Sequence, residues 1–210
     1  SINTLGKRTK CTFESEHFAE YLDGSYDLGT GKLVELKGLW YLHIPVTQAV
    51  EDFQKENVRH VVGIDRGLRF LTVSYDEQGK TEFVSGKKMA TKRHKFQEVR
   101  RQLQSKGTKS AKRRLKPISG RENRWMSDVN HQLSKTLVQK YGKDTLFVLE
   151  DLTGVSFEES NISKTAKQNY DLRSWSFYQL EQFLTYKAHE NRSEVLKVSA
   201  KYTSQRCPKC

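Results

Sequence analysis

HVVGID, residues 60–65 of the chain, is an apolar run that ends in a carboxylate, Asp65. A second run of the same kind, LFVLE at residues 146–150, ends in Glu150. Short apolar runs of this length predict β-strands, and the unbroken hydrophobicity of the second predicts a strand covered on both faces. We therefore expect Asp65 and Glu150 at the ends of two buried strands.

The segments around these runs alternate between strand and helix patterns. Residues 68–75 and 81–84, joined by a polar turn, predict two strands that complete a meander with residues 60–65. Apolar residues recur every four positions from Trp125 to near Gly142 and predict an amphipathic helix. A second helix over 177–188 and a strand over 195–198 follow. This order of elements is that of an RNase H-like core, an α/β fold with a mixed sheet and flanking helices.

Residues 1–59 have a different character from the rest of the chain. They read as short strands joined by tight turns, such as the glycine turn at 29–31. The sequence thus predicts a small β-rich segment (1–59), a core (60–200) and a short tail (201–210).

The composition favours a polyanionic partner. The 210 residues carry a formal charge of +12, and the pI is about 9.6. Such a charge suits nucleic acid or an anionic membrane surface. No apolar run reaches the ~18 residues needed to cross a bilayer, and no signal peptide opens the chain. We expect a cytoplasmic, nucleoid-associated protein without a membrane partner; its oligomeric state is left open.

Most of the excess charge lies in residues 87–124, where fifteen Lys and Arg residues face two acidic ones. This segment is predicted to be partly helical, with a break at Gly107 and an end at Pro117 and Gly120. A charge run is often only a solvated helical face. An unbalanced one repels itself unless a polyanion binds, so we expect contacts with phosphates. The residues expected to make them are Lys87, Lys88, Lys92, Arg93, Lys95, Arg100, Arg101, Lys112, Arg113 and Arg114.

Asp65 and Glu150 are candidate metal ligands. A buried carboxylate is costly unless a positive charge neutralises it. If the two strands are adjacent and parallel, the pair can hold hard divalent ions, magnesium or manganese, which activate water in phosphodiester cleavage. Each acid, taken alone, is also explained as the first polar residue after a strand. Asp151, the next residue after Glu150, is expected to point to the other face of the sheet.

The three cysteines do not form a disulfide framework. Cys207 and Cys210 make a C-x-x-C pair, a spacing that indicates zinc or redox chemistry and is half of a tetrahedral zinc site. Cys11 is remote in the sequence. Because the chain starts at Ser1 without Met and stops on Cys210, we expect it to be a piece of a longer protein.

Four motifs follow one another along the chain: GIDRGL at 63–68, VLEDL at 148–152, WSF at 175–177 with YKA at 186–188, and YTSQRCPKC at 202–210. In these motifs the chain resembles the TnpB family of transposon-encoded, OrfB-type proteins, long described as transposases. The family is now understood as RNA-guided DNA nucleases related to compact type V CRISPR effectors.

The resemblance implies a RuvC-type nuclease core in which Asp65 and Glu150 are catalytic and bind magnesium. It also implies DNA and a guide RNA as partners, and a four-cysteine zinc ribbon in the intact protein that begins with Cys207 and Cys210. Residues 1–59 are then the last strands of a β-barrel that precedes the core.

The family pattern also includes a third catalytic Asp beyond the zinc ribbon, and the chain ends before it. The acids considered as substitutes all precede the last predicted helix; they are Asp144, Asp151, Glu158, Glu159 and Asp171. We therefore expect this chain to bind metal weakly and to cleave poorly. Two alternatives stay open: a catalytically dead nucleic-acid-binding protein, and an accessory factor of transposition that does not cut DNA.

Overall fold

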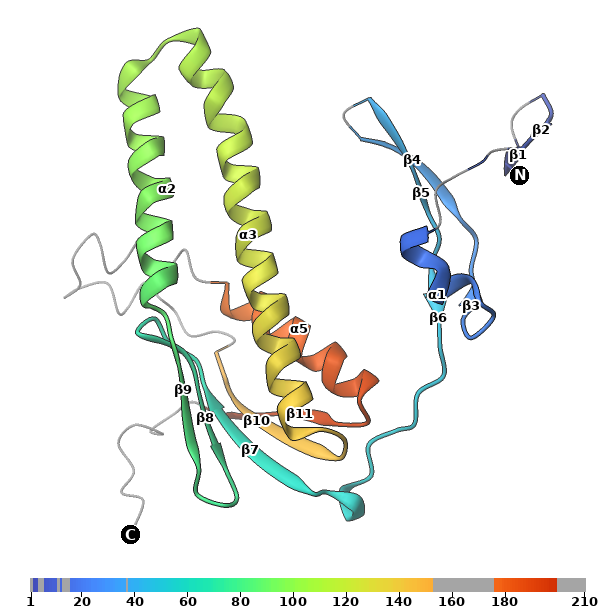
Figure 1. Ribbon diagram of the computed structural model, residues 1–210, viewed down its shortest axis with the longest axis vertical. Coiled ribbons are helices and arrows are strands. Elements are labelled where there is room, and N and C mark those ends of the chain that lie inside the picture. Colours follow the sequence, from blue (N-terminus) through green and yellow to red (C-terminus); the bar gives the residue numbers. More distant parts are fainter. Residues whose placement is uncertain are drawn as a thin grey trace. The chain divides into compact units, whose positions relative to one another are not determined.

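A five-stranded mixed sheet contains both apolar runs (Figure 1). In the computed structural model of the chain, the strands lie in the order β11-β10-β7-β8-β9. β10 pairs in parallel with β7 and with β11, whereas the β7–β8 and β8–β9 pairs are antiparallel. The predicted meander and the two later strands are confirmed. The strands are β7 (His60–Asp65), β8 (Phe70–Asp76), β9 (Thr81–Ser85), β10 (Thr145–Asp151) and β11 (Glu194–Ser199).

The structure describes residues 2–3, 6–10, 12, 16–36, 38–152 and 176–199. Contacts within the chain divide it into two units, Ser1–Val50 and Glu51–Cys210, and the sheet belongs to the second. The tail from residue 200 onward, with its C-x-x-C pair, lies outside the described residues.

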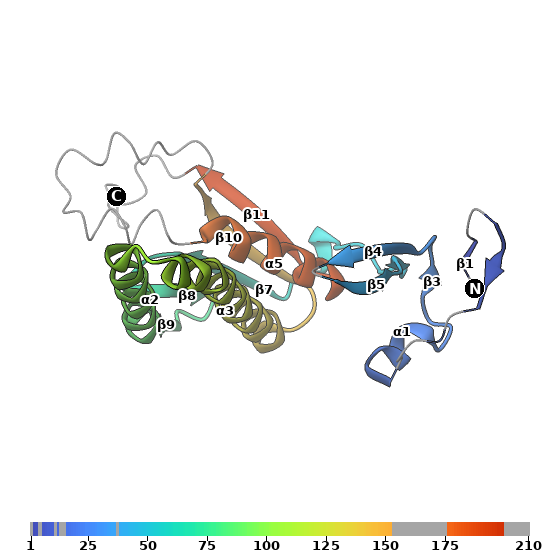
Figure 2. The ribbon, with the colours of Figure 1, turned by 90° about the horizontal axis from the view of Figure 1, so that it is seen from above.

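Within the described part of the second unit, three helices accompany the sheet: α2 (Lys87–Lys106), α3 (Lys109–Tyr141) and α5 (Phe177–Glu190). α2 begins directly after Gly86, where a side chain would collide with the carbonyl oxygen of Leu68. It ends at Gly107, which adopts a left-handed φ of 63°. Thr108 then caps α3 by accepting a hydrogen bond from the amide of Ala111 at 3.2 Å. α2 and α3 run side by side as a helical hairpin (Figures 1 and 2).

The predicted helix end at Pro117 and Gly120 is wrong, because α3 continues through both residues to Tyr141. Proline inside a helix removes the bond to the carbonyl four residues earlier and costs about 3 kcal/mol. Packing against α2 outweighs this local preference. Ile118 is buried beside the proline, and Glu122, also buried, forms an ion pair with Arg100 of α2.

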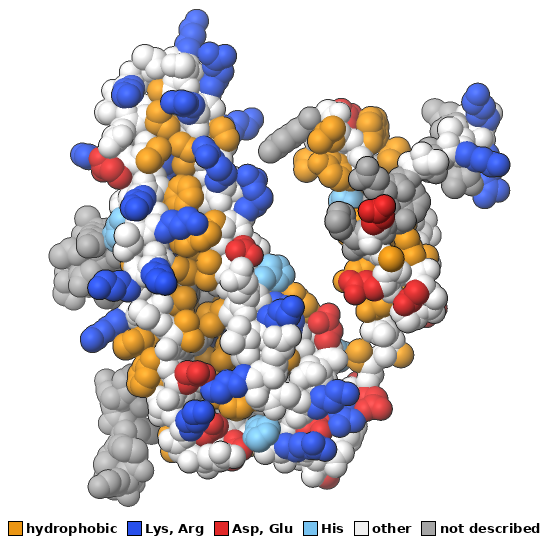
Figure 3. All heavy atoms as spheres, viewed as in Figure 1, with side chains coloured by type: hydrophobic (Ala, Val, Ile, Leu, Met, Phe, Trp, Pro, Cys, Tyr) orange, Lys and Arg blue, Asp and Glu red, His pale blue; other side chains and the backbone are white. Residues whose placement is uncertain are grey.

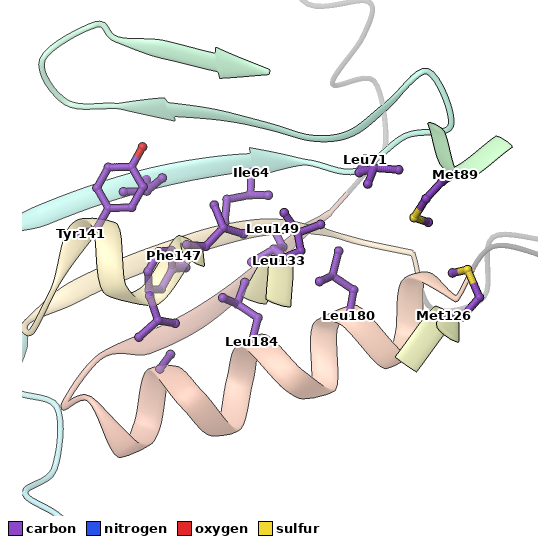
Figure 4. Close-up of a cluster of buried hydrophobic side chains, with 14 residues drawn as sticks. Ile64, Leu71, Met89, Met126, Leu133, Tyr141, Phe147, Leu149, Leu180 and Leu184 are labelled. Atoms are coloured by element: carbon purple, nitrogen blue, oxygen red, sulfur yellow. The ribbon is translucent and has the colours of Figure 1, made fainter. Parts of the chain in front are cut away.

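The hydrophobic core lies between one face of the sheet and the helices α3 and α5 (Figure 4). Phe147 and Leu149 of β10 are almost completely buried, as is Val62 of β7. They meet Leu180 and Leu184, which α5 places on one side because they are four residues apart. The core is therefore built from alternate residues of each strand, as the two-residue period of a strand requires.

In the part of the chain that the structure describes, the opposite face of the sheet is more open than the sequence predicted for residues 146–150. Leu146 and Val148 of β10 are half-buried, so β10 is not equally covered on both faces by the described residues. Exposed side chains on this face include Val61, Tyr75 and Phe83, at 42%, 57% and 58% exposure.

An ion pair joins the starting ends of the three parallel strands. Asp144, which precedes β10, accepts hydrogen bonds from Arg192 Nε at 2.7 Å and Nη2 at 2.8 Å. The amide of Arg59, before β7, donates to the Asp144 carbonyl at 2.8 Å. Asp144 and Arg192 adopt left-handed φ angles of 60° and 51°, which the ion pair helps to hold. Arg192 also keeps the pKa of Asp144 below its ordinary value.

The first unit, in the residues that the structure describes, contains short strands in three two-stranded sheets. An apolar groove of about 950 Å³, lined by Tyr21 and Trp40 among others, lies within it. Its elements are β1 (Ile2–Asn3), β2 (Arg8–Thr9), a 3-10 turn (Glu16–Phe18), α1 (Ala19–Leu22), β3 (Asp27–Leu28), β4 (Lys32–Leu36), β5 (Leu39–His43) and β6 (Val46–Thr47). A second 3-10 turn (Lys55–Asn57) precedes β7.

A histidine lies at the contact between α3 and α5. The ring of His131 stacks on Phe183, with 3.7 Å between ring centroids. Lys187 Nζ lies 3.3 Å from His131 Nδ1 and also donates to the His131 carbonyl at 2.9 Å and to Ser134 Oγ at 2.6 Å. His131 is largely exposed, but partial desolvation at this contact, and then the positive charge of Lys187, lower its pKa. This contact therefore favours the neutral imidazole.

Acidification should weaken this contact. Because the pKa of His131 is lower in the folded chain than its ordinary value of 6.5, the unfolded chain takes up the proton first. The contribution of the neutral His131 ring to the free energy of unfolding is fully present above pH 6.5, and it falls as the pH drops below that value. We expect His131→Phe, which keeps the aromatic stack, to lose less stability than the wild type between about pH 7.5 and 5.5 in urea titrations. His189→Gln, on the exposed side of α5, is the matched control, and an unchanged pH dependence in His131→Phe would contradict the prediction.

Candidate functional site

Asp65 and Glu150 occupy equivalent positions on adjacent parallel strands. Ile64 of β7 pairs with Leu149 of β10, and the two acids are the next residues in each strand. Ile64 and Leu149 face the helices, with 3% and 1% exposure. Because side chains alternate along a strand, Asp65 and Glu150 both point to the opposite, open face. Asp65 is exposed there and Glu150 is half-buried.

This arrangement can bind a cation. Two carboxylates on neighbouring strands repel each other, and a shared positive charge removes the repulsion. Their oxygens are the ligands that magnesium and manganese prefer. Among the residues that the structure describes, no group of three or more His, Cys, Asp and Glu side chains is placed to hold a metal ion. If the pair holds an ion, ligands beyond these two must complete the site.

Directly behind the carboxylates, on the helix face, lies Arg66. Its side chain is 1% exposed. Arg66 Nη2 donates to the backbone carbonyl of Glu150 at 2.6 Å, and Nη1 donates to Glu181 Oε2 at 3.0 Å and to the Phe177 carbonyl at 3.3 Å. A buried guanidinium is tolerated because these acceptors satisfy its charge and its donors. Arg66 thus links the end of β7 with β10 and with the first turn of α5.

The charges continue from Arg66 across the sheet. Glu181 also accepts from Lys197 Nζ of β11, at 3.3 Å. The same Lys197 ammonium lies 4.0 Å from Asp151 Oδ1. Asp151 therefore points to the helix side, as the sequence predicted, and away from Glu150. Arg66, Glu181, Lys197 and Asp151 form a row of alternating charge, which we call the backing network.

The other acids considered as substitutes for a third ligand do not join this site in the described residues. Asp144 is at the start of β10, the opposite end from Glu150, and is paired with Arg192. Glu158, Glu159 and Asp171 lie outside the described residues, as do Cys207 and Cys210.

The predicted nucleic-acid-binding residues lie on the α2–α3 hairpin (Figure 3). Arg93, at 4% exposure, is buried, and Arg100 is half-buried and paired with Glu122. Arg101 is exposed and pairs with Glu98 one turn earlier. These three are buried or paired with an acidic side chain, whereas Lys92 lies over the ring of Trp125, 4.5 Å from its centroid. The remaining seven are exposed: Lys87, Lys88, Lys92, Lys95, Lys112, Arg113 and Arg114.

Sequence reasoning missed the backing network. Arg66 and Glu181 are 115 residues apart, and their pairing depends on the placement of α5 on the sheet. One signal was present: Glu181 follows Leu180 directly and flanks the apolar stripe of α5, next to a position that is buried. A glutamate that is buried is almost always paired, but the sequence pattern alone does not show that Glu181 is buried.

The chain matches known families along most of its length. The family OrfB_IS605, described as "Probable transposase", matches residues 43–155, more than half of the chain. The TNB domain of Cas12f1-like proteins matches residues 177–210. The first match contains Asp65, Glu150 and the whole α2–α3 hairpin, and the second contains α5 and β11.

Three curated relatives are similar in sequence. A TnpB-like protein of Methanocaldococcus jannaschii is 27% identical over 206 residues, which cover 94% of this chain and 71% of that protein. The CRISPR-associated endodeoxyribonuclease Cas12f1 of Sulfoacidibacillus thermotolerans is 25% identical, over 90% of this chain and 46% of that protein. The Cas12f1 of Syntrophomonas palmitatica is 26% identical, over 96% and 42%. This chain therefore spans less than half of either Cas12f1.

Two solved structures share the fold. A cryo-EM structure of a Cas12f1–sgRNA–target DNA complex superposes with a TM-score of 0.53 at 16% identity, over 85% of this chain and 44% of that one. A CRISPR-Cas12f ternary complex superposes with a TM-score of 0.55 at 20% identity, over 92% and 40%. The predicted α/β fold with a mixed sheet and flanking helices is thereby confirmed. Together with the family match over residues 43–155 and the TnpB-like relative, these findings show that the chain belongs to the OrfB_IS605 family of TnpB-type transposases.

Proposed function

We propose that this chain is the core of an RNA-guided DNA endonuclease with an RNase H-like, RuvC-type sheet, in which Asp65 and Glu150 are catalytic. The observation that carries the proposal is their position on adjacent parallel strands, one residue beyond the Ile64–Leu149 pair and on one face. The relatives whose names describe endodeoxyribonucleases support it, as does a target DNA in a structure of the same fold.

The two carboxylates fit a hard divalent ion. When bound, magnesium or manganese would activate the attacking water and stabilise the leaving oxygen of the phosphodiester. Asp65 and Glu150 would each supply oxygen ligands, and the two strands would keep these ligands at a fixed spacing. The sheet face on which they lie is open in the described residues, so a nucleic-acid strand has access to them. A third ligand from elsewhere in the protein would complete the site.

The α2–α3 hairpin is proposed to bind the nucleic-acid backbone. It is long: α3 has 33 residues, which extend about 50 Å as a helix. Residues 87–124 contain fifteen Lys and Arg residues but two acids, and both acids already pair with arginines of the hairpin itself. Contacts of this kind are with phosphates and carry little sequence information, so target choice would rest on base pairing with a guide RNA.

The C-x-x-C pair is proposed to supply two of four zinc ligands in the intact protein. The match of residues 177–210 to a TNB domain includes both cysteines. Thiolates at this spacing are common zinc ligands. This site would be structural and separate from the carboxylate pair.

A second function is favoured by one observation. Among the described residues, no third His, Cys, Asp or Glu side chain joins Asp65 and Glu150 in a group placed to hold a metal ion, whereas residues 87–124 carry fifteen Lys and Arg residues. A protein with this charge and an incomplete metal site would bind nucleic acid without cutting it. Cleavage assays on the full-length protein separate the two functions.

Neutralising either acid should abolish cleavage but not binding. Asp65→Asn and Glu150→Gln keep the size of each side chain but remove the charge that holds the metal ion. In the full-length protein with its guide RNA, we expect the cleavage rate to fall at least as far as the loss of a metal ligand's outer partner would take it, about 10- to 100-fold. The affinity for target DNA should stay nearly unchanged. Asp52→Asn, at an exposed position outside the sheet, is the control. Loss of DNA binding in both acid variants would show that the acids are structural.

Manganese should stabilise this chain through the same acids. A ligand that binds only the folded state adds RT ln(1 + [L]/Kd), so 10 mM manganese acting on a site with a Kd of about 1 mM adds about 1.4 kcal/mol. We expect this increase in urea titrations of the wild type and its loss in the double variant Asp65→Asn/Glu150→Gln. An equal increase in the double variant would place the ion elsewhere.

The hairpin should set the salt dependence of binding. For the triple variant Lys112→Gln/Arg113→Gln/Arg114→Gln, we expect weaker binding to all DNA sequences alike. The slope of log K against log salt should become shallower by about 0.9 for each phosphate that the variant no longer neutralises. The charge-matched control Lys55→Gln/Lys80→Gln/Lys143→Gln changes exposed lysines outside the hairpin. Equal effects of the two triple variants would mean that net charge alone, and not the hairpin, governs binding.

A further inference from the structure

We infer that Arg66 is a positioning residue, which sets the spacing of the carboxylate pair from the opposite face of the sheet. This inference rests on the proposed function, because it assumes that Asp65 and Glu150 hold one metal site together. Arg66 itself is buried on the helix face, and its donors are directed at the fold rather than at the open face where the acids lie. Its side chain leaves β7 on the helix face, directly after Asp65 has left it on the open face.

The link between the two acids runs through one side chain. Arg66 directly follows Asp65 in the sequence. Its Nη2 donates a hydrogen bond to the backbone carbonyl oxygen of Glu150 at 2.6 Å. The paired register of β7 with β10 ends at Ile64 and Leu149. At the next position, where the acids lie, the guanidinium joins the strands in place of the backbone ladder.

The guanidinium is in turn held by α5. Its Nη1 donates to Glu181 Oε2 at 3.0 Å and to the carbonyl of Phe177, the first residue of α5, at 3.3 Å. Glu181 is 10% exposed and the Arg66 side chain 1% exposed, so water competes little for these bonds. A planar guanidinium can direct separate N–H groups at two acceptors, which a lysine ammonium on a flexible stem does less well.

The rest of the backing network connects β11 to the same point. Lys197 of β11 bridges Glu181 at 3.3 Å and lies 4.0 Å from Asp151, the residue after Glu150. The row of alternating charge therefore touches β7, α5, β11 and β10 in turn. Each of the two carboxylates has a neighbour in sequence that belongs to this network, Arg66 for Asp65 and Asp151 for Glu150.

The backing network would act on the spacing of the Asp65 and Glu150 carboxylates rather than on the charge around the metal ion. If the ends of β7 and β10 separate, Asp65 and Glu150 can no longer share an ion at their usual spacing, although both remain present. Outer partners of this kind commonly change metal affinity or activity by about 10- to 100-fold. A purely structural role would instead lower the amount of folded protein and leave the metal dependence of the folded fraction unchanged.

The test compares metal dependence among network variants. Arg66→Lys keeps the positive charge but loses the planar guanidinium that directs separate N–H groups at different acceptors. Glu181→Gln keeps a hydrogen-bond acceptor but loses the negative charge. In the full-length protein with its guide RNA, we expect the magnesium concentration for half-maximal cleavage to rise by about 10- to 100-fold in Arg66→Lys and to rise less in Glu181→Gln. In this chain, the affinity for manganese, measured from the EPR signal of the free ion, should fall in the same order. Arg69→Lys, at an exposed position three residues away, is the matched control.

The outcomes separate this inference from the proposed function. If Asp65→Asn and Glu150→Gln abolish cleavage while Arg66→Lys and Glu181→Gln keep the wild-type metal dependence, the positioning role is overturned and the proposed function stands. If Asp65→Asn cuts DNA normally, the proposed function fails and the inference fails with it. If Arg66→Lys does not fold, the metal dependence of Glu181→Gln and Lys197→Met tests the inference instead. The Lys197 side chain is 42% exposed, so its replacement is tolerated more easily. Wild-type manganese affinity in both of these variants would overturn the inference.

Discussion

The parallel pairing of β7 with β10 is the constraint on which the rest of the structure depends. Its register places Ile64 beside Leu149 in the core, and it therefore places Asp65 beside Glu150 on the open face. If β7 slipped by one residue along β10, its apolar side chains would leave the core and Asp65 would enter it, because the side-chain period of a strand is two. Burial of Phe147, Leu149 and Val62 thus fixes the register of the candidate site as well as the stability of the fold.

The helices decide which face of the sheet is available for chemistry. α3 and α5 bury one face, and the ion pair of Asp144 with Arg192 closes the starting ends of the parallel strands. The acids lie at the other end of these strands and on the face that the described helices leave open. The long α2–α3 hairpin adds positive charge that begins directly after β9. The candidate metal-binding acids and the exposed basic side chains are thereby carried by different elements, so the basic side chains are not placed on the strands beside the carboxylates.

The sequence predicted the features that depend on local pattern. Apolar runs with acidic ends gave β7, β10 and the two candidate acids, and the break at Gly107 followed from a glycine that adopts a left-handed φ. The end predicted at Pro117 was wrong because buried contacts with α2, which no local pattern contains, hold α3 together there. The buried position of Arg93, among basic residues predicted to reach phosphates, has the same origin: which side of α2 meets the rest of the fold is a tertiary property.

The backing network shows why charge alone is a poor guide to the role of a residue in this chain. Of its basic residues, those of the hairpin are mostly exposed and can reach a polyanion, whereas Arg66 is buried and its donors are directed at a carbonyl and a carboxylate of the fold itself. A buried ion pair is a weak source of net stability, because desolvation offsets most of its attraction. Its contribution in this place is geometric, since directed bonds join the ends of β7 and β10 beyond the last paired residues of these two strands, Ile64 and Leu149. A pair of carboxylates that must share one ion requires such a fixed spacing, and hydrophobic packing alone would define it less sharply.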